Sequence, residues 1–91
     1  MRENAFKNFL ENDSSISSKD KAVTSRVAKA VNVGKTYGVD LDSIVIDDRK
    51  TYDLLIRIQP NDVHGVKQNA VRKYYAFVNG ADFPRLRNFT R

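Results

Sequence analysis

Hydrogen-bond donors and cations are concentrated between Asp62 and Gly80, in the segment DVHGVKQNAVRKYYAFVNG. The long polar side chains of this segment belong to Lys67, Gln68, Asn69, Arg72 and Lys73. Lysine and arginine neutralise phosphate groups, while amide and guanidinium groups also donate to base edges in the grooves of DNA. These residue types therefore predict a nucleic-acid-binding surface, and a simple solvated helix face is the competing interpretation.

The apolar residues of the same segment predict a helix that positions these side chains. Positions i, i+1, i+4, i+7 and i+8 form one apolar stripe of Ala70, Val71, Tyr74, Phe77 and Val78. At about 100° per residue, the opposite face carries Gln68, Asn69, Arg72, Ala76 and Asn79. Asp62 or Asn61 can cap the start of this helix, and Gly80 can end it in a left-handed conformation.

A second basic helix is predicted between Lys19 and Tyr37. Its apolar stripe consists of Val23, Val27, Ala30, Val31 and Gly34. The far face carries Lys21, Ser25, Lys29 and Asn32, with Arg26 and Lys35 at its flanks. Hydroxyl groups between lysines are typical of phosphate-binding surfaces, because phosphate oxygens accept hydrogen bonds from both. Ser18 or Ser17 is the expected N-cap, and a solvated lysine face is again the alternative.

Shorter elements are predicted in the rest of the chain. Residues 3–12 place Phe6, Phe9 and Leu10 at helical spacing. Residues 49–59 form a helix capped by Asp47 or Asp48, with a strand as the alternative for the run LLIRI. The expected inner face of this helix consists of Tyr52, Leu54, Leu55, Ile56, Ile58 and Gln59. The run that holds Leu41, Ile44 and Ile46 forms either one short turn of helix or a buried loop.

These elements predict an all-α fold, a small four- to five-helix bundle. Its single domain comprises residues 1–82, and residues 83–91 form a basic tail or linker stub. In that tail Phe83, Leu86 and Phe89 recur every three residues, which allows a last short helix or an extended arm. We expect Tyr75, Phe83 and Phe89 to be exposed and able to anchor a protein partner.

The net charge of +5 is distributed unevenly along the chain. Residues 13–37 carry a net charge of +3 and residues 63–91 a net charge of +5, whereas residues 38–62 carry −3. If the two basic segments pack side by side, they form one basic surface backed by an acidic flank. This layout is typical of phosphate binding.

No constellation of catalytic or metal-binding residues is visible in the sequence. The chain has no cysteine, and its single histidine, His64, has no Cys or Glu at ligand spacing, which favours a surface or capping role. The adjacent Asp47 and Asp48 suit capping better than a carboxylate pair, and the glycines lack phosphate-loop spacing. We expect no enzyme activity, metal or cofactor. With no run near the ~20 apolar residues of a membrane span, we expect a cytoplasmic protein without membrane contact.

Several sequence features follow one another in a familiar order. A short helix of the form AFxxFL precedes a Ser-rich turn, a long basic helix that leads into YGVDLD, a third helix, and a fourth helix that carries NAVRKYYAFVNG. This order resembles the N-terminal core-binding domain of phage integrases and other tyrosine recombinases, a SAM-like helical bundle. The resemblance spans about Ala5 to Gly80, and the AVRKYYAFVNG motif also resembles SAM-like domains fused to nucleases and restriction proteins.

The resemblance implies a non-catalytic module that binds double-stranded DNA in DNA recombination and integration. In that family the second and fourth helices generally face the duplex, and the catalytic residues lie in a separate domain. Carried over by position, the implied DNA-binding residues are Lys21, Ser25, Lys29, Asn32, Lys67, Gln68, Asn69, Arg72 and Lys73. We expect Arg72→Ala or Lys29→Glu to weaken DNA binding without unfolding the domain.

The resemblance also implies a recombinase or nuclease catalytic domain as a further partner. The alternative function is a SAM-like protein-interaction or regulatory module of a mobile-element or nuclease-associated protein. Binding to random duplex at low salt separates the two functions, because an interaction module should show little of it.

Overall fold

The structure, a computed structural model, describes residues 1–14, 16 and 19–89, without the side chains of residues 19 and 20. The described residues form the helices α1 (Glu3–Glu11), α2 (Lys19–Tyr37), α3 (Leu41–Val45), α4 (Asp48–Ile58) and α5 (Val66–Asn79). Short 3-10 turns lie at Gln59–Asn61, Val63–Gly65 and Leu86–Asn88. No strand occurs in this part of the chain. The prediction of a small all-α bundle is therefore confirmed.

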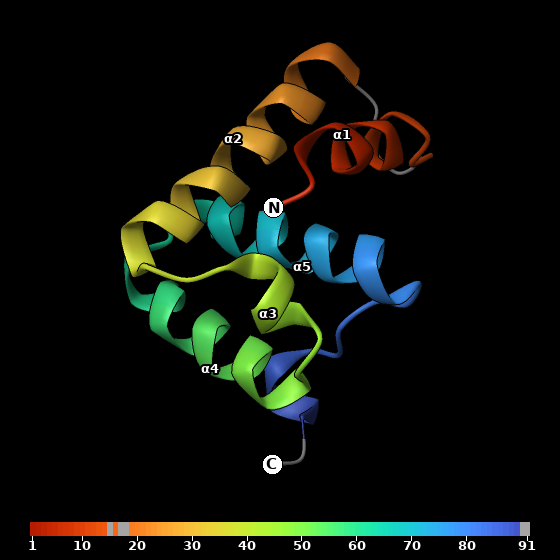
Figure 1. Ribbon diagram of the computed structural model, residues 1–91. Helices are drawn as coiled ribbons and strands as arrows, with labels where there is room; N and C mark the ends of the chain where they lie inside the picture. Colours follow the sequence, from red (N-terminus) through yellow and green to blue (C-terminus); the bar gives the residue numbers. More distant parts are fainter. Residues whose placement is uncertain (15, 17–18, 90–91) are drawn as a thin grey trace.

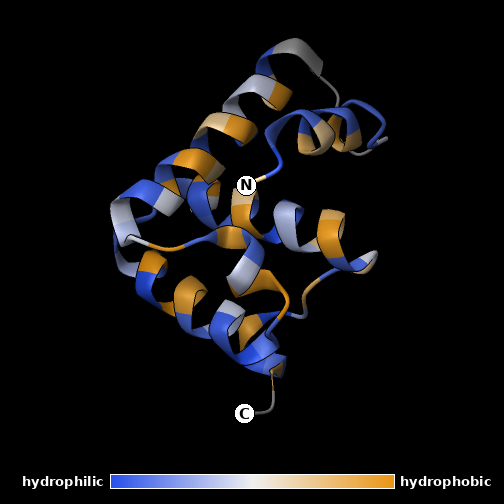
Figure 2. Cartoon of the chain, in the orientation of Figure 1, coloured by the Kyte–Doolittle hydropathy of each residue, from blue (hydrophilic) through white to orange (hydrophobic). Residues whose placement is uncertain are grey.

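Helix α5 is the centre of the bundle. It contacts each of the other four α-helices, with α1 and α2 on one side of it and α3 and α4 on the other (Figure 1). Of its predicted stripe, Ala70, Val71 and Tyr74 are fully buried, and Phe77 and Val78 are half-buried and pack against the core. Figure 2 shows that hydrophobic and hydrophilic residues alternate along the helices, as expected for amphipathic helices around one core.

The central position of α5 corrects one detail of its predicted outer face. Ala76, which the periodicity places opposite the core, is buried with 8% of its surface exposed. It lines a depression together with Phe9 and Asn12, at the end of α1 and in the turn that follows. A helix surrounded by neighbours on several sides keeps a narrower outer face than a helix that rests on one side of a core.

The buried face of α2 is rotated from the predicted stripe. Val23, Ala30 and Val33 are buried, whereas Val27 and Val31 are only half-buried. Val27 and Val31 turn toward α1, where they line a groove. The sequence spacing fits either stripe, and the packing of α2 against both α5 and α1 decides between them.

The helix predicted for residues 49–59 is α4, which ends at Ile58, and Gln59 begins a 3-10 turn. The strand alternative for LLIRI is excluded. The buried positions of α4 are Thr51, Leu54, Leu55 and Ile58, so the inner face is centred one residue away from the predicted one. Ile56 is 39% exposed and Gln59 is exposed, which corrects the prediction for both. The short element α3 is a turn of helix that buries Leu41 and Val45, while Ile46 is 72% exposed.

The helix ends follow the predicted local chemistry. The Asp47 carboxylate accepts from the amides of Arg49 and Lys50, and Gly80 ends α5 with φ 72°. The Asp62 carboxylate accepts from the amides of Lys67 and Gln68 at 2.9 and 2.8 Å, so it caps α5 from a distance of several residues. The predicted cap of α2 at Ser17 or Ser18 lies outside the described residues.

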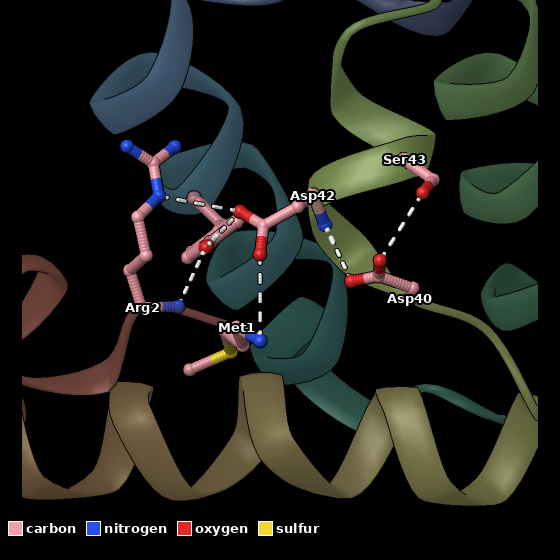
Figure 3. Close-up of polar contacts among 6 residues, drawn as sticks. Met1, Arg2, Asp40, Asp42 and Ser43 are labelled. Carbon is pink, nitrogen blue, oxygen red and sulfur yellow. Dashed lines mark hydrogen bonds and ion pairs between the residues drawn. The ribbon is translucent and has the colours of Figure 1, made fainter.

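A buried polar network joins the start of the chain to the centre of the bundle. The hydroxyl group of the fully buried Tyr74 donates a hydrogen bond to the Asp42 carboxylate and accepts one from the backbone amide of Arg2 at 3.0 Å (Figure 3). The N-terminal ammonium of Met1 and the side chain of Arg2 also lie 3.4 and 3.5 Å from the Asp42 carboxylate. Burial favours a higher pKa for Asp42, but these partners outweigh it and hold the pKa below its ordinary 3.8.

The segment after α5 folds back onto the bundle. Phe83 is buried with its ring edge-on to Tyr75, and Phe89 stacks between Phe83 and Tyr52 at centroid distances of 5.3 and 4.8 Å. Leu86 also packs against the core. The prediction that Tyr75 and Phe83 are exposed is therefore wrong, because each ring is the other's packing partner and only 8% and 5% of their surfaces remain accessible.

Candidate nucleic-acid interface

Helices α2 and α5 pack against each other, which brings the two basic segments of the sequence together. At their junction lies a small pocket of about 80 Å³, lined by Ser25, Arg26, Lys29, Val66 and Asn69. We refer to it as the seam pocket. Three of the predicted DNA-binding residues, Ser25, Lys29 and Asn69, therefore meet at one place, although they are distant in sequence.

Arg26 is a member of the seam pocket that the sequence analysis placed only at the flank of α2. Its Nε atom is buried, and no hydrogen-bond acceptor among the described residues reaches it. Arg26 lies three residues after Val23 and four before Ala30, so it shares the inward side of α2 with these two buried residues. That spacing was the available signal, but the shifted predicted stripe concealed it.

A second depression, of about 240 Å³, continues from the seam pocket along α5. It is lined by Asn69, Arg72, Lys73, Asp82 and Phe83. Asn69 is exposed and lines both hollows. Asn69 is thus the predicted groove-contacting residue with the most open position.

Arg72 has a structural role that the sequence did not reveal. Its Nη1 donates to the carbonyl oxygens of Phe83 and Pro84 at 3.0 and 3.1 Å, and its guanidinium lies over the Phe83 ring at 5.8 Å. Burial lowers the pKa of this guanidinium below its ordinary value, because charge is less well solvated inside the protein. Arg72 therefore ties α5 to the segment that follows it.

Lys73 and Gln68 also make contacts within the protein. The Lys73 ammonium forms an ion pair with Asp13, and both side chains are mostly buried, with 28% and 16% of their surfaces exposed. The Gln68 side chain lies 3.5 Å from the carbonyl oxygen of Leu55 on α4, which is the limit of a hydrogen bond. Asn79, at the other end of α5, donates to the carbonyl oxygen of Val45 at 2.9 Å. Much of the polar side of α5 thus connects neighbouring elements.

The remaining predicted DNA-binding residues are Lys21, Lys67 and Asn32, and none of them lines the seam pocket. Lys21 is exposed in the first turns of α2, and Lys67 is half-buried in the first turn of α5. Asn32 is exposed on the side of α2 that faces α1, and its Oδ1 accepts from the Thr36 hydroxyl at 3.4 Å. The structure thus separates Asn32 from Ser25, Lys29 and Asn69, with which the sequence had grouped it.

A groove on the α1 side of α2 is a further concave feature, and Asn32 lies in it. It has a volume of about 540 Å³. Val27, Ala28 and Val31 supply its apolar wall, and its polar lining consists of Glu3, Asn4, Lys7, Thr24, Asn32 and Lys35. The mixed charge of this lining contrasts with the seam pocket, whose two charged residues are both cations.

The acidic segment lies on the other side of the central helix. Helices α3 and α4 and their connecting turns carry Asp40, Asp42, Asp47, Asp48 and Asp53. Figure 1 shows α3 and α4 across α5 from α2. The two basic helices are therefore adjacent, as expected from the sequence. The acidic helices approach α2 at its C-terminal end, where Arg57 of α4 lies over the Tyr37 ring at 5.2 Å.

Comparison with known proteins adds no assignment to this geometry. No protein-family model, curated protein or solved structure matches the chain. Within the described residues, no three His, Cys, Asp or Glu side chains are grouped so that they can hold a metal ion. In the same part of the chain, every helix is too short or too polar to cross a bilayer.

Proposed function

We propose that this protein is a non-catalytic module that binds the phosphate backbone of double-stranded DNA through the junction of α2 and α5. The observation that carries the proposal is the seam pocket, where Ser25, Arg26, Lys29 and Asn69 combine two cations, a hydroxyl and an amide. Phosphate oxygens accept hydrogen bonds from each of these groups. Lys21 and Lys67 lie on the same two helices and extend the positive charge beyond the pocket.

The separation of charge across the fold supports the same function. The acidic residues of α3 and α4 lie across α5 from the N-terminal half of α2, which holds the seam pocket, so a polyanion approaching that half is kept apart from them. The resemblance to the core-binding domain of tyrosine recombinases points to the same two helices. The contacts of Arg72 and Gln68 with carbonyl oxygens reduce the donors left for base edges, so the proposed binding is mainly to the backbone.

A fluorescence-anisotropy titration of a short random-sequence duplex at several salt concentrations tests this function. If Lys21, Arg26, Lys29 and Lys67 each contact a phosphate, log K should fall with log salt with a slope of about −3.6, or −0.9 per contact. A salt-independent affinity, or no binding at low salt, would contradict the proposal.

A charge reversal at Lys29 locates the binding surface. Lys29→Glu should weaken duplex binding by about tenfold and reduce the magnitude of the salt slope by about one or more. Lys50→Glu is the matched control, because Lys50 is an exposed lysine on α4 beside the acidic residues. Equal effects of the two substitutions would show that binding does not use α2.

The protein-interaction alternative loses two of its three predicted anchors. Tyr75 and Phe83 are buried against each other, and Phe89 is half-buried against Tyr52 and Phe83. Interface anchors must present accessible surface to a partner. We therefore propose the DNA-binding function alone.

A further inference from the structure

We infer that the seam pocket is a binding site for a single phosphate group, held between Arg26 and Lys29. This inference rests on the proposed function for the source of the phosphate, a phosphodiester of the DNA backbone. The recognising chemistry is the same for a free phosphate, so the pocket can be tested separately from the duplex.

The composition of the pocket selects for an anion. Among its lining residues, Arg26 and Lys29 are cations, Ser25 and Asn69 supply neutral donors, and Val66 is apolar. None of these five residues carries negative charge. Two cations held near each other repel, and a bound anion removes that repulsion while accepting hydrogen bonds from the same groups.

The environment of Arg26 is the independent observation that points to a ligand. Its buried Nε has no acceptor among the described residues, although buried polar groups usually have a partner. The Nε–H group of this half-buried side chain has therefore lost its hydration without gaining a compensating hydrogen bond. A charge that is already partly desolvated attracts an oppositely charged ligand more strongly than a fully hydrated lysine does.

The start of α5 contributes little to this selectivity. The amides of Lys67 and Gln68 are bonded to the Asp62 carboxylate, which occupies the positive end of the helix. The side chains of α2 must therefore supply the attraction. The pocket of about 80 Å³ is small, and it fits one tetrahedral oxyanion better than a nucleotide base or a sugar.

The experiment is a titration of the isotope-labelled protein with inorganic phosphate, followed by amide and arginine Nε–Hε chemical shifts. Sodium chloride at matched ionic strength is the control, because screening alone also moves the resonances of charged residues. We expect saturable shifts at Ser25, Arg26, Lys29 and Asn69. Arg26→Gln should weaken phosphate binding by about tenfold, whereas Lys50→Gln should leave it unchanged.

A second variant keeps the test decisive if Arg26→Gln does not fold. Lys29→Gln removes the other cation from a half-buried position, and the dispersion of its amide spectrum reports folding independently of phosphate. If a folded variant of either kind binds phosphate as tightly as the original protein does, the inference is overturned.

The same labelled protein titrated with duplex distinguishes failure of the pocket from failure of the function. Phosphate binding in the pocket without duplex binding supports the phosphate-binding site and assigns it to a free phosphorylated ligand. The same result overturns the DNA-binding function. Duplex binding without shifts at Arg26 and Lys29 overturns the phosphate-binding site but supports the DNA-binding function. Shifts at these residues with both ligands support both proposals, and no binding of either ligand overturns both.

Discussion

Arg72 Nη1 lies 3.0 Å from the carbonyl oxygen of Phe83 and donates a hydrogen bond to it. The same nitrogen reaches the carbonyl oxygen of Pro84 at 3.1 Å. One cation of α5 thus satisfies two backbone acceptors in the segment that closes the aromatic cluster of Tyr75, Phe83 and Phe89. Arg72 is therefore a structural residue as well as a predicted DNA contact.

Replacing Arg72 should lower stability. Arg72→Ala removes a charged donor from two carbonyl oxygens, and hydrogen bonds to charged groups contribute about 1.5–3 kcal/mol. Urea unfolding should therefore show a loss of free energy of unfolding in that range. Arg85→Ala, at an exposed position of the same segment, should change it by no more than about 0.5 kcal/mol. If the two variants are equally stable, the contacts of Arg72 do not stabilise the fold.

This structural role affects how DNA-binding experiments are designed. From the sequence, both Arg72→Ala and Lys29→Glu are expected to spare the fold. Among the described residues, no hydrogen bond or ion pair joins Lys29 to a neighbour, so Lys29→Glu is the cleaner test of binding.

The contact of Tyr74 with Asp42 should make stability depend on pH in the acid range. The pKa of Asp42 is lower in the folded protein than its ordinary 3.8, so the folded state binds fewer protons than the unfolded chain as the pH falls. Its contribution is present above pH 3.8 and is lost as the pH falls through the folded pKa. Asp42→Asn should cost about 1–2 kcal/mol at neutral pH and progressively less below pH 3.8.

Urea unfolding of the original protein and Asp42→Asn between neutral and acidic pH measures this effect. Tyr74→Phe removes the hydroxyl but keeps the buried ring, so it should reproduce part of the loss and raise the pKa of Asp42. A stability difference between the original protein and Asp42→Asn that stays constant down to low pH would contradict the assigned role of Asp42.

Tyr75 should ionise only in strongly alkaline solution. Its burial raises the pKa to about 12, and the hydrogen bond to Asp48 at 2.8 Å and the charge of that carboxylate act in the same direction. The folded state therefore keeps the phenol proton when the unfolded chain loses it near pH 10.0. The corresponding stability is complete below pH 10.0 and is lost as the pH rises through about 12.

An ultraviolet titration of phenolate absorbance, with Tyr75→Phe for assignment, checks this prediction. Asp48→Asn should lower the pKa of Tyr75 only in part, since burial is the largest cause of the shift. Ionisation of Tyr75 near pH 10.0 in the folded protein would contradict its buried, hydrogen-bonded environment.

The ion pair between Lys73 and Asp13 should oppose DNA binding while it stabilises the fold. Asp13→Asn removes a negative charge that lies against a predicted phosphate contact, so duplex affinity should rise by about threefold at low salt. Because the pair is mostly buried, its loss should lower the free energy of unfolding by more than the ~1 kcal/mol of an exposed ion pair. Anisotropy and urea unfolding measure the two effects.

The control for this pair is Glu11→Gln, which makes the same change of charge at an exposed position of α1. It should leave stability unchanged and affect DNA binding less than Asp13→Asn does. If both substitutions raise the affinity equally, the effect is one of net charge and gives Lys73 no specific role.

The sequence by itself determined the helices and several of their ends. Local rules suffice there, because a carboxylate at Asp47 or Asp62 and a glycine at Gly80 act within a few residues of the helix they terminate. Periodicity also identified Ala70, Val71 and Tyr74 as core residues. The uneven distribution of charge was likewise readable without coordinates.

Only the tertiary structure decided which polar residues remain available to a ligand. Periodicity describes one side of a helix, but α5 is covered by four neighbours, so Arg72, Lys73 and Asn79 bond to other elements. The packing of α2 against both α1 and α5 likewise turned Arg26 toward the seam pocket and Asn32 toward α1. Such choices depend on contacts between residues distant in the chain, because the spacing within α2 fits more than one buried face.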